Sequence, residues 1–137
     1  MTEQPDAAAV AELLRGFHEA FATGDADALA ACFTEDAQMH LLHSDPSIGR
    51  EAIRVRWLAG FERLDTSAWE PVTQLTEICG ERAFAFTTYT ERLLDRRTGE
   101  RTLVRGRLVH WMSRGSDGTW RIDFLMNSHS HPMEPIA

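Results

Sequence analysis

The chain has 137 residues, of which 43% are hydrophobic, and its 14 basic and 21 acidic residues give a formal net charge of -7. This length and apolar content suit one folded core, so we expect a single domain over residues 1–137. The acidic balance excludes nucleic acid and anionic membrane surfaces as expected partners, because both attract basic proteins. The chain has no apolar run long enough for a bilayer and no secretory signal pattern, so we expect a cytoplasmic location.

Three helices are predicted in the first half of the chain. A first helix has one apolar face, formed by Val10, Leu13, Leu14, Phe17 and Phe21. Gly24 and Asp25 predict its end and the cap of a short second helix, whose apolar face continues the stripe with Leu29, Cys32 and Phe33. From Gly49 a third helix carries Ile53, Trp57, Phe61 and Leu64 on one side.

The second half of the chain changes to the pattern of β-strands. A brief strand at Met39 and Leu41 precedes the third helix. Runs rich in β-branched and aromatic residues, separated by short turn sequences, then predict four long strands over residues 69–79, 82–95, 101–114 and 118–128. Such short turns join antiparallel neighbours. Helices followed by strands predict an α+β fold.

Five features together resemble the nuclear transport factor 2-like superfamily, over nearly the whole chain. They are the order of elements, the Gly24-Asp25 turn, the box Phe33–Ala37, the helix start Gly49–Ile53 and the final strand that begins at Asp117. Within the superfamily the chain is most similar to SnoaL-like and ketosteroid isomerase-like bacterial proteins, a group that includes polyketide cyclases, isomerases and dehydratases. The resemblance implies a cone-shaped roll, in which three N-terminal helices pack on a curved, mostly antiparallel sheet around a pocket.

The same resemblance indicates where a pocket would carry its chemistry. Where ketosteroid isomerases have an oxyanion-stabilising tyrosine this chain has Phe17, and Leu41 stands at the place of their catalytic carboxylate. The place of their second acid falls on His110, and an aromatic wall residue is matched by Trp57. Proton abstraction beside a carbonyl needs a base and a donor, so we do not expect standard ketosteroid isomerase activity.

A histidine and an aspartate on the last two long strands are the candidate catalytic pair. His110 with Asp123 resembles the pair that SnoaL-like cyclases use, and the two residue types are common in acid/base catalysis. The pattern of the last strand allows two registers. One puts Asp123, Asn127 and His129 on the pocket face, whereas the other buries Trp120, Ile122, Phe124 and Met126 and turns Asp123 outward. A bulge near the strand start is a third arrangement.

The expected substrate-binding residues come from the helices and from the inner sheet face. They are Phe17, Phe21, Phe33, His40, Leu41, Trp57, Tyr89, Asn127 and His129. Asp45 is a reserve candidate for the missing base if its loop folds inward, although Asp-Pro is also common turn chemistry. His110 is equally consistent with a core histidine, and Tyr89 with a sheet aromatic.

We expect no cofactor and no metal. His129 and His131 are spaced to share a strand face, but they lie beside a proline-containing tail that is typical of a solvated end. We expect Cys32 and Cys79 to be small buried hydrophobes rather than a disulfide or a reactive pair. The basic hairpin around Arg96, with acidic neighbours that include Glu91, is typical of a solvated or subunit-facing strand pair.

Aromatic residues occur on both faces of the long strands, which favours a homodimer that buries the outer sheet face. The expected ligand is a small apolar or polycyclic molecule. Three functions fit these observations: a cofactor-independent cyclase, isomerase or dehydratase, a non-catalytic ligand-binding or accessory protein, and a structural domain whose own side chains fill the pocket.

Overall fold

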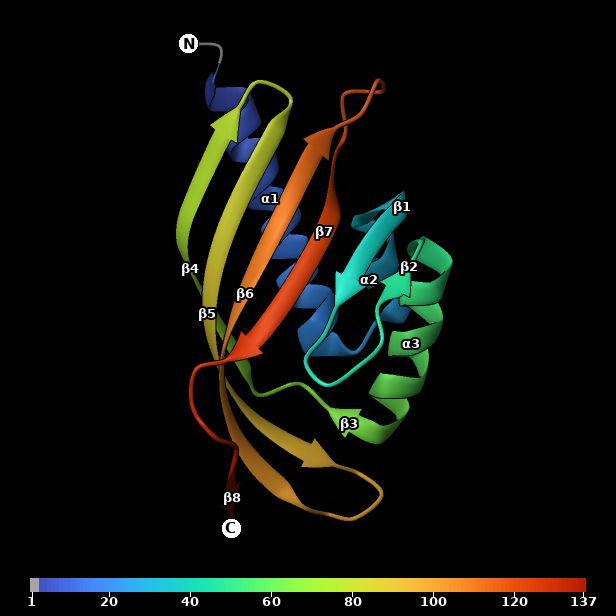
Figure 1. The fold of residues 1–137 in the computed structure, drawn as a ribbon, viewed down its shortest axis with the longest axis vertical. Helices are drawn as coiled ribbons and strands as arrows, with labels where there is room; N and C mark the ends of the chain where they lie inside the picture. The colour runs from blue at the N-terminus through green and yellow to red at the C-terminus, as the bar shows by residue number, and fades with distance from the viewer. Residues whose placement is uncertain (1–2) are drawn as a thin grey trace.

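The computed structural model describes residues 3–137 (Figure 1). Its helices are α1 (Glu3–Thr23), α2 (Ala26–Ala31) and α3 (Arg50–Arg63). Its strands are β1 (Phe33–His40), β2 (Ser47–Ile48), β3 (Leu64–Asp65), β4 (Trp69–Cys79), β5 (Arg82–Asp95), β6 (Arg101–Arg114), β7 (Trp120–His129) and β8 (Glu134–Ile136). The four long strands fall where the sequence predicts them, and the α+β class is confirmed.

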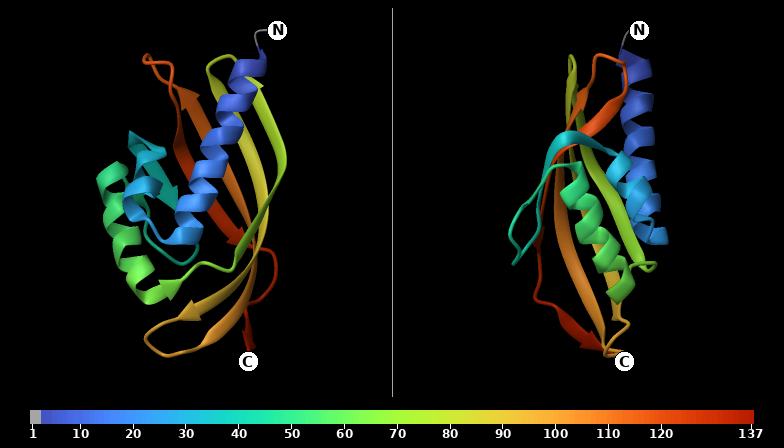
Figure 2. Two further views of the ribbon diagram at one scale, coloured as in Figure 1. Left: turned by 180° about the vertical axis from the view of Figure 1, so that it is seen from behind. Right: turned by 90° about the vertical axis from the view of Figure 1, so that its right-hand side faces the viewer.

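The sheet is mixed and strongly curved. Its strand order is β2-β1-β7-β6-β5-β3, with β4 also paired to β5 and β8 to β6. Every pairing is antiparallel except that of β1 with β7, which is parallel. The helix α1 lies across one face of the long strands, while α2 and α3 stand beside β1 (Figures 1 and 2). The resulting roll encloses the core between the helices and the concave face of the sheet.

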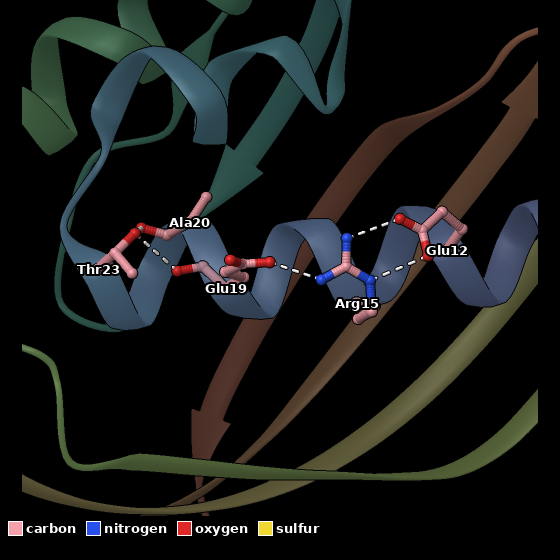
Figure 3. Close-up of polar contacts among 5 residues, drawn as sticks. All are labelled: Glu12, Arg15, Glu19, Ala20 and Thr23. Atoms are coloured by element: carbon pink, nitrogen blue, oxygen red, sulfur yellow. Dashed lines mark hydrogen bonds and ion pairs between the residues drawn. The ribbon is translucent and has the colours of Figure 1, made fainter.

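The helix α1 is amphipathic, as its sequence predicts. Val10, Leu14 and Phe17 are buried against the sheet. On the solvent side the Arg15 guanidinium donates to the Glu12 carboxylate, at 2.7 and 2.9 Å, and also to Glu19 (Figure 3). Exposed pairs of this kind stabilise a helix only slightly. Among residues 3–137 no helix has the length and apolar character that a membrane crossing requires.

Two glycines fix the turns that surround α2 and α3. Gly24 has φ 71° and is followed by Asp25, whose carboxylate caps α2 by accepting from the amide of Ala28 at 3.0 Å. Gly49, with φ 95°, stands immediately before α3. The helix end predicted at Gly24 and the helix start predicted at Gly49 are therefore confirmed.

Phe33 and Leu64 were expected at the ends of helical stripes, yet each begins a strand. The amide of Ile122 on β7 donates to the carbonyl of Cys32 at 2.8 Å, and Phe33 pairs with Ile122. Leu64 likewise pairs with Asp95 of β5. Long-range pairing with the sheet therefore ends α2 before Phe33 and α3 before Leu64, although the apolar periodicity of each helix extends to these residues.

Candidate functional site

A cavity of about 160 Å³ lies between the helices and the concave face of the sheet. It is of the size that holds a single aromatic ring. Its walls come from every layer of the fold: Phe17, Phe21, Leu29, Met39, Leu41, Trp57, Leu64, Thr66, Trp69, Tyr89, Glu91, Leu93, Val104, Leu108, Leu125, Asn127, His129 and Met133. Met133 is 55% exposed and marks a side on which the cavity meets solvent.

The polar side chains of this cavity are few. They are Thr66, Tyr89, Glu91, Asn127 and His129. The hydroxyl of Thr66 donates to the carbonyl of Phe21 at 2.6 Å, so its proton is already used within the fold. The pKa of His129 is lowered by burial and by nearby His43, which favours the neutral imidazole. The remaining three groups carry most of the polar character of an otherwise apolar site.

Glu91 is the charged group that the sequence analysis placed wrongly. It was assigned to a solvated or subunit-facing hairpin, but the residue is only 6% exposed within the single chain, and its Oε2 atom has no hydrogen-bond partner among the described residues. Burial raises the pKa of its carboxyl to about 7. The signal was the alternation on β5, because Thr87 and Tyr89 face inward and Glu91 follows two residues later.

Tyr89 and Asn127 form a hydrogen-bonded pair on the cavity wall. The amide of Leu42 donates to Oδ1 of Asn127 at 2.8 Å, and Nδ2 of Asn127 donates to the Tyr89 hydroxyl at 3.2 Å. Burial raises the pKa of Tyr89, while the hydrogen bond from Asn127 opposes that shift. The phenol therefore stays protonated at neutral pH.

Seven of the nine expected binding residues line this cavity. They are Phe17, Phe21, Leu41, Trp57, Tyr89, Asn127 and His129. Phe33 does not: it is fully buried in the core, with its ring centroid 6.0 Å from that of Phe17. His40 lies on the outer face, where its ring stacks on Phe124 at 4.9 Å. Whether the seven bind a ligand stays a prediction.

His110 points inward but lies behind the cavity wall. Its side chain is fully buried, and its ring centroid is 5.2 Å from that of Phe17, which lines the cavity. Neither ring nitrogen has a hydrogen-bond partner among the described residues. Burial, with a smaller effect of His18, lowers the pKa of His110 to about 3. The imidazole is therefore neutral and separated from the cavity by the Phe17 ring.

Asp123 does not share a cavity with His110, which corrects the expected catalytic arrangement. On β7, Ile122 pairs with Met112 and Phe124 pairs with Trp111, so Asp123 is an extra residue at a bulge. Its carboxylate accepts from the Ser113 hydroxyl at 2.7 Å and lies 3.6 Å from the guanidinium of Arg82. Asp123 thus contacts outward-facing residues of β5 and β6.

The bulge also explains why two registers fitted the last strand. Before it, Trp120 and Ile122 are buried, as the apolar register predicts. After it, Leu125 is buried and Asn127 and His129 line the cavity, as the polar register predicts. Each alternation therefore holds over half of β7.

The remaining acidic and histidine candidates lie outside the cavity. Asp45 is exposed, so its loop does not fold inward to replace a base. His131 is exposed and hydrogen bonds to its neighbour Ser130 at 2.9 Å. Within residues 3–137, no three His, Cys, Asp or Glu side chains gather in a way that would hold a metal ion.

Solved structures with the same fold include proteins of several kinds. A ketosteroid isomerase-like protein from Erwinia carotovora atroseptica is 17% identical, with 91% of this chain and 96% of that chain covered and a TM-score of 0.85. A putative aromatic ring hydroxylase from Novosphingobium aromaticivorans is 21% identical, with coverages of 94% and 92% and a TM-score of 0.79. A hexachlorocyclohexane dehydrochlorinase, LinA-type3, from Novosphingobium barchaimii is 13% identical, with coverages of 97% and 91% and a TM-score of 0.78.

At these identities the structural likeness establishes the fold alone. A search of curated protein sequences found no significant match. The model of the SnoaL-like domain family, in contrast, matches residues 14–121, which is most of the chain. The match includes α2, α3 and the strands β1 to β6. This chain is a member of the SnoaL-like domain family.

Proposed function

We propose that this protein binds a small, largely apolar molecule in the cavity and that Glu91 transfers a proton to or from it. The observation that carries the proposal is the buried Glu91 carboxyl, whose Oε2 atom has no hydrogen-bond partner in the part of the chain that the structure describes. A pKa of about 7 lets this group act as a base when ionised and as an acid when protonated, near neutral pH. Apolar walls with a few polar groups are typical of small-molecule sites.

Glu91 replaces the expected pair of His110 and Asp123 in this proposal. His110 is shielded by Phe17, and Asp123 contacts Ser113 and Arg82 instead of the cavity. Tyr89 lies two residues before Glu91 on the same face of β5, and both line the cavity. A ligand in the cavity can therefore meet a phenol and a carboxyl together. The reaction class is cofactor-independent acid/base chemistry, as in an isomerase, cyclase or lyase.

The test uses 5-nitrobenzisoxazole, a probe with two fused rings that reports proton abstraction from carbon and that needs the open side of the cavity near Met133 for part of its volume. The Glu91 carboxylate would take the ring C–H proton, the released electron pair would complete a nitrile, and the N–O bond would break to leave a coloured phenolate. We expect the rate to rise with pH around a midpoint of about 7, following Glu91. Glu91→Gln should lower this rate by roughly 100-fold, the usual scale for a positioned base.

Glu62→Gln is the matched control, because Glu62 is exposed on α3 and outside the cavity. It should leave the rate and its pH midpoint unchanged. Equal rates for Glu91→Gln and the unaltered protein would contradict the role of Glu91. Loss of rate in both variants would instead indicate a general effect of surface charge.

A non-catalytic binding protein is the second candidate. It is favoured by the apolar Phe17 and Leu41, which line the cavity where the resemblance leads us to expect a donor and a base. In that case the probe would quench the fluorescence of Trp57 and Trp69, which also line the cavity, without being converted. Binding without turnover would therefore favour this candidate over the enzyme.

We also propose that a second copy of the chain covers the outer sheet face. One line of paired residues crosses five strands there: Leu75, Phe86, Val109, Met126 and His40. The next line contains Phe84, Trp111 and Phe124, with ring centroids 5.0 and 5.7 Å apart, and Trp111 is 41% exposed. Apolar surface that is continuous in this way marks association sites in soluble proteins.

Sedimentation of a Trp111→Glu variant tests this homodimer. The unaltered protein should sediment as a dimer and the variant as a monomer, because a charge would be placed in the apolar contact. Leu58→Glu is the control, since Leu58 is 48% exposed on α3, away from this face. A monomeric unaltered protein, or a dimeric Trp111→Glu variant, would contradict the proposed interface.

A further inference from the structure

Gly106 and Tyr89 face each other across neighbouring strands at an unusually close approach. They are cross-strand partners on β6 and β5, and Gly106 also pairs with His129 of β7. A Cβ atom on Gly106 would lie 2.3 Å from Cζ and 2.4 Å from the hydroxyl oxygen of Tyr89, and 2.9 Å from the carbonyl of Ser128. No side chain fits there, so the absence of one allows the Tyr89 ring to lie across β6 toward β7.

This placement brings the Tyr89 hydroxyl to Asn127, whose amide orientation is itself fixed. The backbone N–H of Leu42 can only donate, so the atom of Asn127 that it contacts at 2.8 Å is the oxygen. The NH₂ group of Asn127 is therefore the atom facing Tyr89, at 3.2 Å, and it donates. The phenol oxygen accepts this hydrogen bond and keeps its own proton for another partner.

The phenol proton has no protein acceptor among residues 3–137, and Tyr89 lines the cavity. We propose that Gly106 and Asn127 are positioning residues that hold Tyr89 as a hydrogen-bond donor to an uncharged acceptor oxygen, such as a carbonyl, on the ligand. This inference rests on the proposed function, because it takes the cavity as the ligand site. It adds the chemical group that the ligand presents beside Tyr89.

A pair of probes with the same shape tests the inference. Acetophenone carries a carbonyl oxygen where α-methylstyrene carries a CH₂ group, so their affinities differ mainly by the hydrogen bond to that oxygen. Both fit a one-ring cavity, and quenching of Trp57 and Trp69 reports binding. Measurement at about pH 9 keeps Glu91 ionised and unable to donate, while Tyr89 is still protonated.

We expect the unaltered protein to bind acetophenone roughly fivefold more tightly than α-methylstyrene, as one net hydrogen bond implies. Tyr89→Phe and Gly106→Ala should bring this ratio to one or below, because a carbonyl oxygen buried without a donor loses its hydration and gains no hydrogen bond. Gly16→Ala is the matched control, since a Cβ atom there meets nothing within 4 Å, and it should keep the ratio. Equal affinity of the unaltered protein for both probes would overturn the inference, whereas binding of neither would contradict the proposed function itself.

Asn127→Asp gives a second test that needs no ligand. The carboxylate still accepts from Leu42 but accepts from Tyr89 as well, so it takes the proton that the ligand would use. Tyr89 is the one tyrosine of the sequence, so the ultraviolet absorbance of phenolate reports its pKa directly. That pKa should rise in Asn127→Asp, because a donor is replaced by a negative charge. An unchanged or lower pKa would overturn the role of Asn127, even if Gly106→Ala failed to fold.

Discussion

Two buried titratable groups on the concave face of the sheet, His110 and Glu91, lie in different surroundings. Beneath α1, His110 is packed against the Phe17 ring, and neither of its ring nitrogens has a hydrogen-bond partner among the described residues. His110 is not among the residues that line the cavity. Farther along the same face, Glu91 and Tyr89 border a cavity. Burial favours the uncharged form of both His110 and Glu91. The comparison teaches that burial alone does not make a site, because a reactive group also needs space for a ligand.

His110 and Glu91 should change the free energy of unfolding in opposite directions as the pH rises, and His110 should have the larger effect. Its pKa is lowered from 6.5 to about 3, so the unfolded state binds a proton first as the pH falls. Stability that is present above pH 6.5 should therefore be lost on acidification, by about 4 kcal/mol near pH 3. His110→Leu should lack this loss, as urea unfolding at several pH values would measure. Parallel profiles for both proteins would show that His110 is charged or solvated in the fold.

Glu91 should instead lower the free energy of unfolding as the pH rises. Its pKa is raised from 4.5 to about 7, so its contribution to stability is present below pH 4.5 and is lost as the pH rises through 7. The loss should be about 3 kcal/mol relative to Glu91→Gln, which cannot ionise. The same unfolding series measures it. A difference between the two proteins that stayed constant with pH would place Glu91 in contact with water.

Asp123 lies on the opposite face of the sheet and is the acidic residue that we expect to have little effect on stability or activity. Its carboxylate is partly exposed and contacts Ser113 and Arg82. Asp123→Asn should therefore change the free energy of unfolding by less than about 1 kcal/mol. It should also leave the conversion of 5-nitrobenzisoxazole unchanged. A large loss of that activity would restore Asp123 to the catalytic role that the sequence first suggested.

The sequence predicts the fold well because its periodicities are strong. The four long strands, α1 and the turns at Gly24 and Gly49 follow from local patterns that the tertiary structure reinforces. The parallel pairing of β1 with β7 is not visible in any local pattern, since it joins segments far apart in the chain. That pairing ended α2 before Phe33, where helical periodicity continued.

The site was predicted less well, for reasons of register and context. The bulge at Asp123 exchanges the two faces of β7, and no local residue pattern marks its position. Glu91 was missed because its charge and its basic neighbours suggested solvent. Seven of the expected binding residues line the cavity, and the apolar ones among them, such as Phe17 and Trp57, are large side chains with few alternatives to the interior. Cys79, which the sequence predicts as a buried hydrophobe, is exposed.

The bulge on β7 has a consequence for how this protein can change over evolutionary time. Asp123 is added without shifting the pairing on either side of it, so Ile122 before the bulge and Leu125, Asn127 and His129 after it all face the interior. Loss of the single codon for Asp123 would remove that extra residue and leave Ile122 opposite Met112 and Phe124 opposite Trp111, so Leu125, Asn127 and His129 would still face the interior. The bulge can therefore lose its one extra residue without any change in which side chains of β7 line the cavity.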